Sequence, residues 1–318
     1  MICSYNKPIN ETCPRKHTTQ GQKLTFASMK ASASSWLILI VLSIVWGSSF
    51  ILMKRGMDVF SADEVGGLRI AIAFVFLLPL YLKKQQINFK KNWKGLVMMG
   101  VFGNFIPAFL FTAAEIQISS SLAGMLNALT PLFTIVIAVI WFKDKFKTIQ
   151  IVGILSGLAG AICLLLFNEG GDANQNILYS LLVVLATICY AISINGIKHY
   201  LQGMNSVTAT LGAFTITGPL ALAYLFLRTD FINDLKSNYL ALKAFGYVSI
   251  LAIIGTALSV IIYNVLIKNA GALFASTCTY LIPVVAVIWG LVDGEAVNLV
   301  QMGGVIVIIL SVYLINRR

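Results

Sequence analysis

A long stretch in the middle of this chain is repeated near its C-terminus. Residues 119–167 and 271–315 share one order of features: small residues, an apolar run with a single proline (Pro131 and Pro283), the letters VIW, an acid, and then a glutamine and a glycine before another apolar run. A repeat of about 150 residues is far longer than the 20 to 50 residues of a solenoid unit. The duplication therefore predicts a protein made of two related halves.

Composition predicts that both halves lie in a lipid bilayer. Of the 318 residues, 58% are hydrophobic and 11% are charged, and the mean hydropathy is +0.86. Soluble domains carry about 25% charged residues. The net charge of +11 could indicate nucleic-acid binding, but the basic residues lie in short loops and form no basic surface interleaved with aromatic residues. We expect a bilayer around the chain and no nucleic-acid partner.

Residues for metal binding or catalysis are scarce. The five cysteines lack metal-knuckle spacing, and histidine occurs only as His17 and His199. No G-x-x-x-x-G-K-[ST] phosphate-binding loop occurs in the sequence. We expect no cofactor, no metal and no catalytic residue.

A helix of about 20 apolar residues crosses the hydrocarbon core of a bilayer. Ten runs meet or approach this length: residues 36–53, 65–82, 96–114, 122–142, 149–167, 177–197, 207–227, 240–267, 273–292 and 299–315. The predicted fold class is an all-α membrane protein with ten transmembrane helices. We expect residues 29–168 and 177–318 to form the two halves. Residues 1–28 are polar, do not resemble a signal peptide, and are expected to be a disordered, dispensable tail or an over-extension of the reading frame.

The loop charges predict the orientation of the helices. Of the 23 Lys and Arg residues, 17 lie in the N-terminal tail, the even-numbered loops and the C-terminus, 5 lie in the odd-numbered loops, and Arg69 lies inside the second run. Positive charge marks cytoplasmic loops, so both termini should face the cytoplasm. Five spans per half is an odd number, so the second half should be inverted relative to the first, as in many secondary transporters.

The remaining parts of the two halves also align. Pro79 and Pro219 occupy matching places in the second and seventh runs. At one constant offset, Trp46, Phe50 and Lys54 of the first run align with Tyr190, Ile194 and Lys198 of the sixth.

Four motifs carry a resemblance to a known family: VWGSSFILMK (Val45–Lys54), Arg69 near the start of the second run, PLFTIVIAVIWFKD (Pro131–Asp144) and IPVVAVIWGLVDGE (Ile282–Glu295). They resemble the drug/metabolite transporter superfamily, in its ten-span branch of paired EamA domains, over nearly everything from Met29 onward. The resemblance implies an inner-membrane carrier that moves a small metabolite, with amino acids or related compounds and export favoured, through a cavity between the halves. Four-span multidrug relatives use a glutamate in the first span for proton exchange. The first run here has none, so that chemistry does not carry over.

Two ionisable residues are candidates for binding or coupling. Arg69 could anchor an anionic substrate group, or it could extend to the interface or pair with Asp63 or Glu64. Glu115, at the end of the third run, could accept a proton during coupled transport, or it could be a wetted helix cap.

Polar and aromatic residues at helical spacing are candidates for the wall of the cavity. Side chains of this kind face the interior of a helix bundle, where they bridge helices or line a wet cavity. The candidates are Trp46, Ser49, Asn104, Asn127, Thr130, Tyr190, Thr256, Ser259, Tyr263, Ser276 and Tyr280.

Two further features are expected to be structural. Asp144 and Glu295 precede helices, where an acid suits the positive end of the helix dipole. Gly153, Gly157 and Gly160 form a seam of small residues that could join helices within one chain or between two copies in a homodimer.

Two other classes of function remain open. A membrane-embedded enzyme would need a nucleophile and a base at one depth. Ser48 and His199 are poorly matched in depth, which argues against that class. A membrane scaffold without transport activity is the other alternative.

Overall fold

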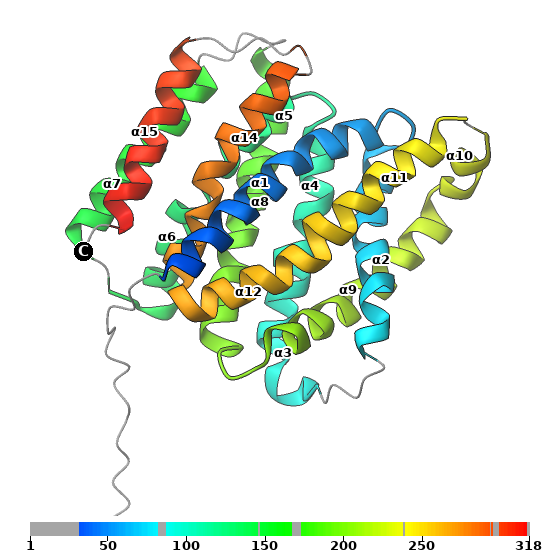
Figure 1. Ribbon diagram of the computed structural model, residues 1–318, viewed down its shortest axis with the longest axis horizontal. Helices are drawn as coiled ribbons and strands as arrows, with labels where there is room; N and C mark the ends of the chain where they lie inside the picture. The colour runs from blue at the N-terminus through cyan, green and yellow to red at the C-terminus, as the bar shows by residue number, and fades with distance from the viewer. Residues whose placement is uncertain are drawn as a thin grey trace, which may run out of the picture. The chain divides into compact units, whose positions relative to one another are not determined.

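The computed structural model describes residues 32–81, 87–145, 147–166, 173–237, 239–292, 294 and 299–316. Within these ranges the chain forms helices and turns and contains no strand (Figure 1). The all-α prediction is therefore confirmed. The expected polar tail, residues 1–28, and Glu295 lie outside the described residues.

Each of the ten predicted apolar runs forms one helix or a series of consecutive helical segments. The first half contains α1 (Ala33–Gly56), α2 (Ala62–Tyr81), α3 (Phe89–Val97), η1 (Met98–Phe105), α4 (Ile106–Ala114), α5 (Ser120–Asn127), α6 (Thr130–Phe142) and α7 (Thr148–Leu166). The second half contains α8 (Ala173–Tyr200), α9 (Ser206–Arg228), α10 (Phe231–Ser237), α11 (Ala241–Ala252), η2 (Ile253–Leu258), α12 (Ser259–Ala270), α13 (Ala272–Ser276), α14 (Cys278–Val292) and α15 (Leu299–Asn316). The short helix α10 was not predicted.

Within the described residues, six helical segments are long and apolar enough to cross a membrane. They are Ala33–Gly56, Phe89–Ala114, Ser120–Phe142, Ile177–Tyr200, Ser206–Arg228 and Ala241–Ala270. Shorter apolar helices lie within α7, across α13 and α14, and within α15. The protein is therefore a multi-pass membrane protein.

Two of the long segments contain a π-helical stretch, in which each turn is wider than in an α-helix. These are η1 and η2, and each is continuous with an α-helix on both sides. In η1, the Asn104 Nδ2 donates to the Met99 carbonyl at 2.9 Å. Next to η2, the Ser259 hydroxyl donates to the Ile254 carbonyl at 2.7 Å. Both bonds span five residues, the spacing of a π turn, and such stretches are frequent at functional sites.

Two other apolar stretches, residues 120–142 and 272–292, are interrupted rather than widened. Turn residues at Ala128 and Leu129 separate α5 from α6, and Thr277 separates α13 from α14. Pro131 follows the first interruption at the start of α6, where a missing N–H costs no helical hydrogen bond. Helical segments at corresponding places in the two halves are thus broken.

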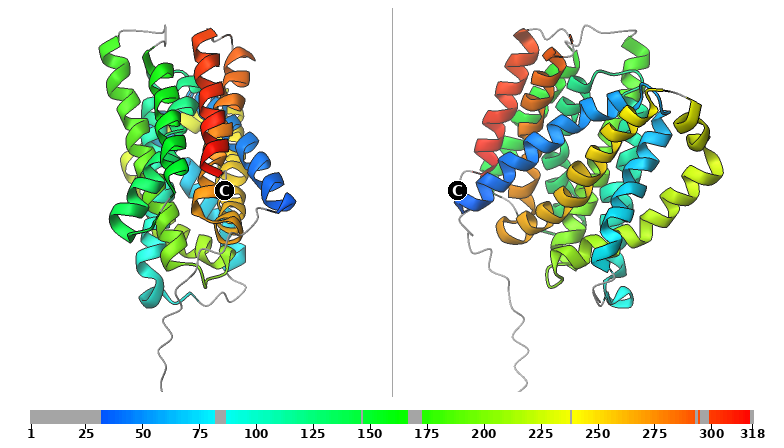
Figure 2. Two further views of the ribbon diagram at one scale, coloured as in Figure 1. Left: turned by 90° about the vertical axis from the view of Figure 1, so that its left-hand side faces the viewer. Right: turned by 45° about the vertical axis from the view of Figure 1, so that its right-hand side comes forward.

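Small residues allow several helices to pack closely. A Cβ atom on Gly47 of α1 would lie 2.5 Å from the Val285 Cβ of α14. A Cβ on Gly157 of α7 would lie 2.7 Å from the Ser311 Oγ of α15 and 3.2 Å from the Tyr280 hydroxyl. Gly157, one residue of the glycine seam predicted on α7, therefore packs against helices of the same chain. Figures 1 and 2 show α7 and α15 side by side, away from α11 and α12, which run alongside α1.

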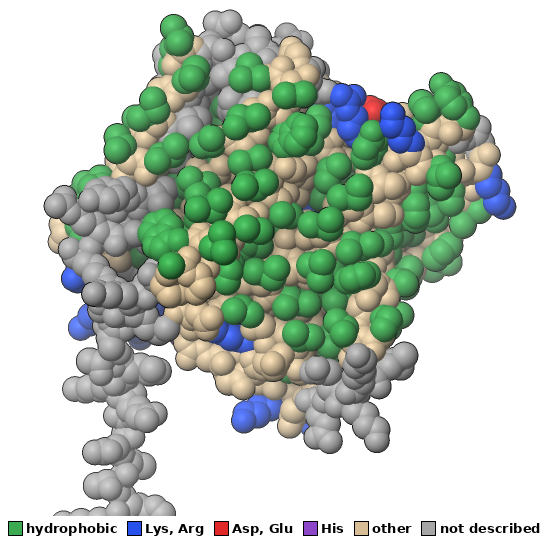
Figure 3. Space-filling view, in the orientation of Figure 1, with side chains coloured by type: hydrophobic (Ala, Val, Ile, Leu, Met, Phe, Trp, Pro, Cys, Tyr) green, Lys and Arg blue, Asp and Glu red, His purple; other side chains and the backbone are tan. Residues whose placement is uncertain are grey.

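The outer surface matches a bilayer. Figure 3 shows hydrophobic side chains over the middle of one face, with most Lys and Arg side chains near its edges. Large apolar residues such as Leu155 and Leu227 are 58% and 78% exposed. Extended exposed apolar surface of this kind marks contact with lipid or another protein.

Candidate functional site

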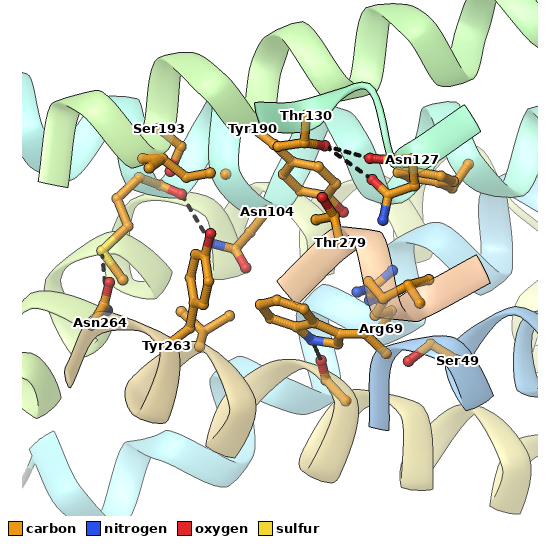
Figure 4. Close-up of a pocket in the computed structure, with 18 of the residues that line it drawn as sticks. Ser49, Arg69, Asn104, Asn127, Thr130, Tyr190, Ser193, Tyr263, Asn264 and Thr279 are labelled. Atoms are coloured by element: carbon orange, nitrogen blue, oxygen red, sulfur yellow. Dashed lines mark hydrogen bonds between the residues drawn. The ribbon is translucent and has the colours of Figure 1, made fainter. Parts of the chain in front are cut away.

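A cavity that is partly open to solvent lies between helices of the two halves. Its wall comes from α1, α2, η1, α4, α5 and α6 of the first half and from α8, η2, α12 and α14 of the second. Within the described part of the chain, α7, α9 and α15 contribute nothing to this wall. Figure 4 shows polar side chains from several of these helices around the same space.

Aromatic rings form much of the wall. The rings of Trp46 on α1 and Tyr263 on α12 meet edge to face, with centroids 4.9 Å apart. The Trp46 Nε1 donates to the Gly255 carbonyl in η2 at 2.9 Å, which fixes the indole against the π segment. Tyr190 on α8 stacks on Phe111 of α4, with centroids 5.9 Å apart. Such rings can hold the apolar or aromatic part of a ligand.

Amides and hydroxyls are placed among the rings. Thr130 donates its hydroxyl to the Asn127 main-chain carbonyl at 2.8 Å, just beyond the break between α5 and α6. Asn104 lines the cavity from η1. Asn264 donates to the Thr210 hydroxyl at 3.0 Å, while its buried Oδ1 atom has no partner among the described residues. These groups offer hydrogen bonds that could orient a ligand.

Arg69 on α2 is the one charged residue on the described wall of the cavity. Its Nε donates to the Thr256 hydroxyl at 2.7 Å, and its Nη1 lies 3.9 Å from the Met53 sulfur. The acids near the start of α2 are engaged elsewhere. The Asp63 Oδ2 accepts from the Tyr224 hydroxyl at 2.8 Å, and the Glu64 Oε2 accepts from the Ser61 N–H at 2.9 Å.

The cavity brings together eight of the residues singled out from the sequence. They are Trp46, Ser49, Arg69, Asn104, Asn127, Thr130, Tyr190 and Tyr263. Their role in binding stays a prediction.

Four other cavity candidates do not line the wall. Ser259 and Ser276 each turn back to a main-chain carbonyl of their own helical segment. Tyr280 is buried, with its hydroxyl beside α7 and α15. Thr256 is buried behind Arg69 and accepts its hydrogen bond. Glu115 is also absent from the wall and is buried at the C-terminal end of α4.

The wall also includes residues that were not predicted, among them Ser193, Asn264 and Thr279. One of them, Thr279, could have been predicted from the duplication. It aligns with Asn127 at the same offset that separates Pro131 and Pro283. Ser193 lies almost one helical turn after Tyr190, so the predicted aromatic position could have indicated it.

Asp144 has a different role from the expected one. It lies in the loop between α6 and α7 and accepts from the Lys198 Nζ at 2.6 Å. Its Oδ2 is also 3.3 Å from the His199 Nε2, and the His199 ring stacks on Phe142 with centroids 4.0 Å apart. Asp144 therefore connects the end of α6 to the end of α8 instead of capping α7. The corresponding expectation for Glu295 falls on a residue outside the described ranges.

Both halves of the chain match one family of known proteins. A sequence model of the EamA-like transporter family matches residues 34–166 and again residues 177–317. The inner membrane transporter YedA of Escherichia coli strain K12, whose activity is uncharacterized, is 28% identical over 283 residues, which cover 87% of this chain and 89% of YedA.

Two other relatives have named substrates. An "S-adenosylmethionine/S-adenosylhomocysteine transporter" of Chlamydia muridarum is 24% identical, over 86% of this chain and 88% of the relative. A "Probable terminal-alkyne amino-acid exporter" of Streptantibioticus cattleyicolor is 23% identical, over 91% and 95%.

A solved crystal structure shares the fold. It superposes with a TM-score of 0.65 at 17% sequence identity, and the match covers 88% of this chain and 96% of the other. At this identity the likeness concerns the fold alone.

Proposed function

Because this chain belongs to the EamA-like transporter family, we propose that it moves a small polar metabolite across the cell inner membrane by alternating access. The observation that carries the proposal is the cavity, whose wall comes from both halves of the chain. Two pairs of residues that align in the duplication, Trp46 with Tyr190 and Phe50 with Ile194, all lie on this wall. A site between the halves is where carriers built from repeats bind their substrates.

The proposed architecture has ten spans in two inverted five-helix repeats, residues 29–168 and 177–318. The two matches to one family model support this division. The π-helical stretches η1 and η2 support it as well, because each lies in the third of the five predicted apolar runs of its half. The unequal distribution of Lys and Arg between alternate loops favours cytoplasmic termini.

In the proposed transport cycle, the halves move relative to each other around the bound solute. The interruptions at Ala128 and Thr277 are candidates for flexible points, because a helix without continuous hydrogen bonds bends more easily there. The Asp144–Lys198 ion pair joins the two halves at the ends of α6 and α8. A contact of this kind would have to break when the cavity opens on that side.

The substrate class we favour is amino acids or related compounds, with export as the direction. The names of the two relatives with named substrates support this substrate class, and the name of the amino-acid exporter supports the direction. The mixture of aromatic rings, amides and hydroxyls around the cavity also suits an amphipathic metabolite of modest size.

The test is counterflow into proteoliposomes that contain the purified full-length protein. Vesicles are loaded with an unlabelled mixture of amino acids and then exposed to each radiolabelled amino acid in turn. A carrier gives saturable, transient accumulation of label above that in protein-free liposomes. Uptake that equals the protein-free control for every compound would contradict the proposal. A scaffold and a membrane enzyme would both give that result, and product analysis of the vesicle contents would identify the enzyme.

A further inference from the structure

The surroundings of Arg69 point to the chemistry of the solute. Arg69 is partly buried in a cavity whose wall is largely apolar and aromatic. Among the described residues no carboxylate pairs with it, and the two acids one or two turns earlier on α2 bond to Tyr224 and to the Ser61 N–H instead. The positive charge is therefore not neutralised by the described part of the protein.

The hydrogen bonds of the guanidinium leave room for a ligand. A guanidinium has five N–H donors and no acceptor. The Nε–H is engaged with Thr256, and the sulfur of Met53 near Nη1 is a weak acceptor. The Thr256 contact fixes the plane of the group, because an Arg held at Nε has little freedom to rotate. The Tyr190 side chain is a further hydrogen-bond partner of the guanidinium, and the remaining Nη donors are preorganised for an oxygen ligand.

We propose that the transported solute carries a carboxylate and that this carboxylate binds the Arg69 guanidinium inside the cavity. The inference rests on the proposed transport function and specifies its substrate. A carboxylate matches the planar guanidinium with two parallel hydrogen bonds, and such charge-assisted pairs are stronger than neutral ones. A charge in a membrane interior is costly unless it is paired, so an entering anion lowers the cost of keeping Arg69 there.

A carboxylate fits better than a phosphate. No second Lys or Arg lies on the described wall, so one positive charge is available, and a phosphate monoester would bring nearly two negative charges. One carboxylate would make the pair neutral. The rings of Trp46 and Tyr190 line the same cavity as Arg69 and could contact the apolar remainder of the solute.

A purely structural role is the competing explanation. In that case Arg69 would hold α2 against η2 through Thr256 and would contact no solute. This role predicts that replacing Arg69 lowers stability without changing which compounds bind. Ligand specificity therefore separates the two explanations.

The experiment measures ligand-induced thermal shifts of the purified full-length protein in detergent. The probes are carboxylates, namely the proteinogenic amino acids, their 2-oxo acids and 3-phenylpropionate, and each is paired with its own amide. We expect at least one acid to raise the melting temperature more than its amide does. In Arg69→Gln the apparent Kd of that acid should rise about tenfold or more, the effect of losing a charge-assisted pair. Arg69→Lys, which keeps the charge but not the planar fork, should fall between Arg69→Gln and wild type.

Arg228→Gln is the matched control, since Arg228 is exposed at the end of α9 and is absent from the cavity wall. It should bind the acid like wild type. The proposal is overturned if no acid outperforms its amide, or if Arg69→Gln binds the acid as well as Arg228→Gln does. A variant that does not fold is replaced by Arg69→Lys, for which unchanged affinity would also overturn the proposal.

Counterflow distinguishes this inference from the transport proposal. If an acid binds through Arg69 but is never transported, the transport proposal fails and the carboxylate site stands. If a cationic or neutral compound is transported equally by wild type and Arg69→Gln, the carboxylate inference fails and transport stands.

Discussion

At the scale of single residues, Arg69 and Glu115 differ in what surrounds them. Both lie in or beside apolar runs, where an ionisable group is a candidate for function. Arg69 lines the cavity, whereas Glu115 is only 8% exposed and lies off the wall at the end of α4. A proton acceptor couples most directly to a solute when it faces the same space. The geometry therefore favours a structural role for Glu115.

We expect Glu115→Gln to keep transport that is driven by a pH gradient. The amide has nearly the same shape as the carboxylic acid but cannot release a proton, so only a coupling role would be lost. The measurement is flux into proteoliposomes with and without an imposed pH gradient, and a protonophore defines the part that depends on the gradient. If Glu115→Gln binds solute normally but no longer responds to the gradient, Glu115 is a coupling residue.

At the scale of helices, the sequence predicted the segments but not their irregularities. The apolar runs were visible because a bilayer demands long stretches without charge. The spacing of Thr256, Ser259 and Tyr263 predicts one face of a regular helix, but Thr256 lies in the π stretch that ends just before Ser259, so the register changes between Thr256 and the other two. The Ser259 hydroxyl bonds to a carbonyl five residues earlier. Ser276 and Tyr280 lie on opposite sides of the break at Thr277, so their spacing did not place them on one face. Such irregularities arise from packing between distant helices, which one sequence does not reveal.

The contact between α1 and α14 gives a prediction about packing. In Gly47→Ala the new methyl group would lie 2.5 Å from the Val285 Cβ and 3.2 Å from the Ile282 carbonyl, so the helices would have to separate. Overpacking of this kind costs about 1–3 kcal/mol, or a fall of about 2–12 °C in Tm. The control is Gly246→Ala on α11, where nothing lies within 4 Å and the Tm should not fall. Equal melting temperatures for the two variants would contradict the close packing.

The connection between α6 and α8 gives a second prediction at this scale. Asp144→Asn removes the charge that faces Lys198, and the two side chains are only 10% and 19% exposed. The free energy of unfolding should fall by about 1–3 kcal/mol, a value between those for losing an exposed and a buried ion pair. Thermal unfolding of Asp144→Asn, Lys198→Gln and the double variant forms a double-mutant cycle. Fully additive effects would show that the pair contributes nothing.

At the scale of the whole molecule, the duplication and the loop charges predict a definite topology. Lys145 lies in the exposed loop between α6 and α7, and Tyr239, 91% exposed, lies between α10 and α11. Our assignment places the first on the cytoplasmic side and the second on the outer side. In spheroplasts, a membrane-impermeant maleimide should label Tyr239→Cys directly and Lys145→Cys only after permeabilisation. Labelling of both positions in intact spheroplasts would contradict the inverted arrangement of the halves.

The cavity itself was only partly predictable. Trp46 and Tyr190 could be chosen because the duplication aligns them and aromatic rings suit a binding wall. Asn264 could not, because its place on the wall depends on how α12 lies against η1 and α9. The sequence places Asp144 before a helix. It does not reveal the ion pair with Lys198, because Lys198 is far away in the sequence. Contacts that cross between the halves are the ones that local spacing does not determine.

The position of Arg69 has a consequence for the ancestry of the chain. The offset between Pro79 and Pro219 carries Arg69 onto Ala209, which is fully buried and has no charge. If the gene arose by fusion of two identical copies, the ancestral pair would have presented either two guanidinium groups or none. The present asymmetry then arose after the fusion, when one copy gained or lost its arginine. From that point a bound solute had one preferred orientation in the cavity, instead of two equivalent orientations.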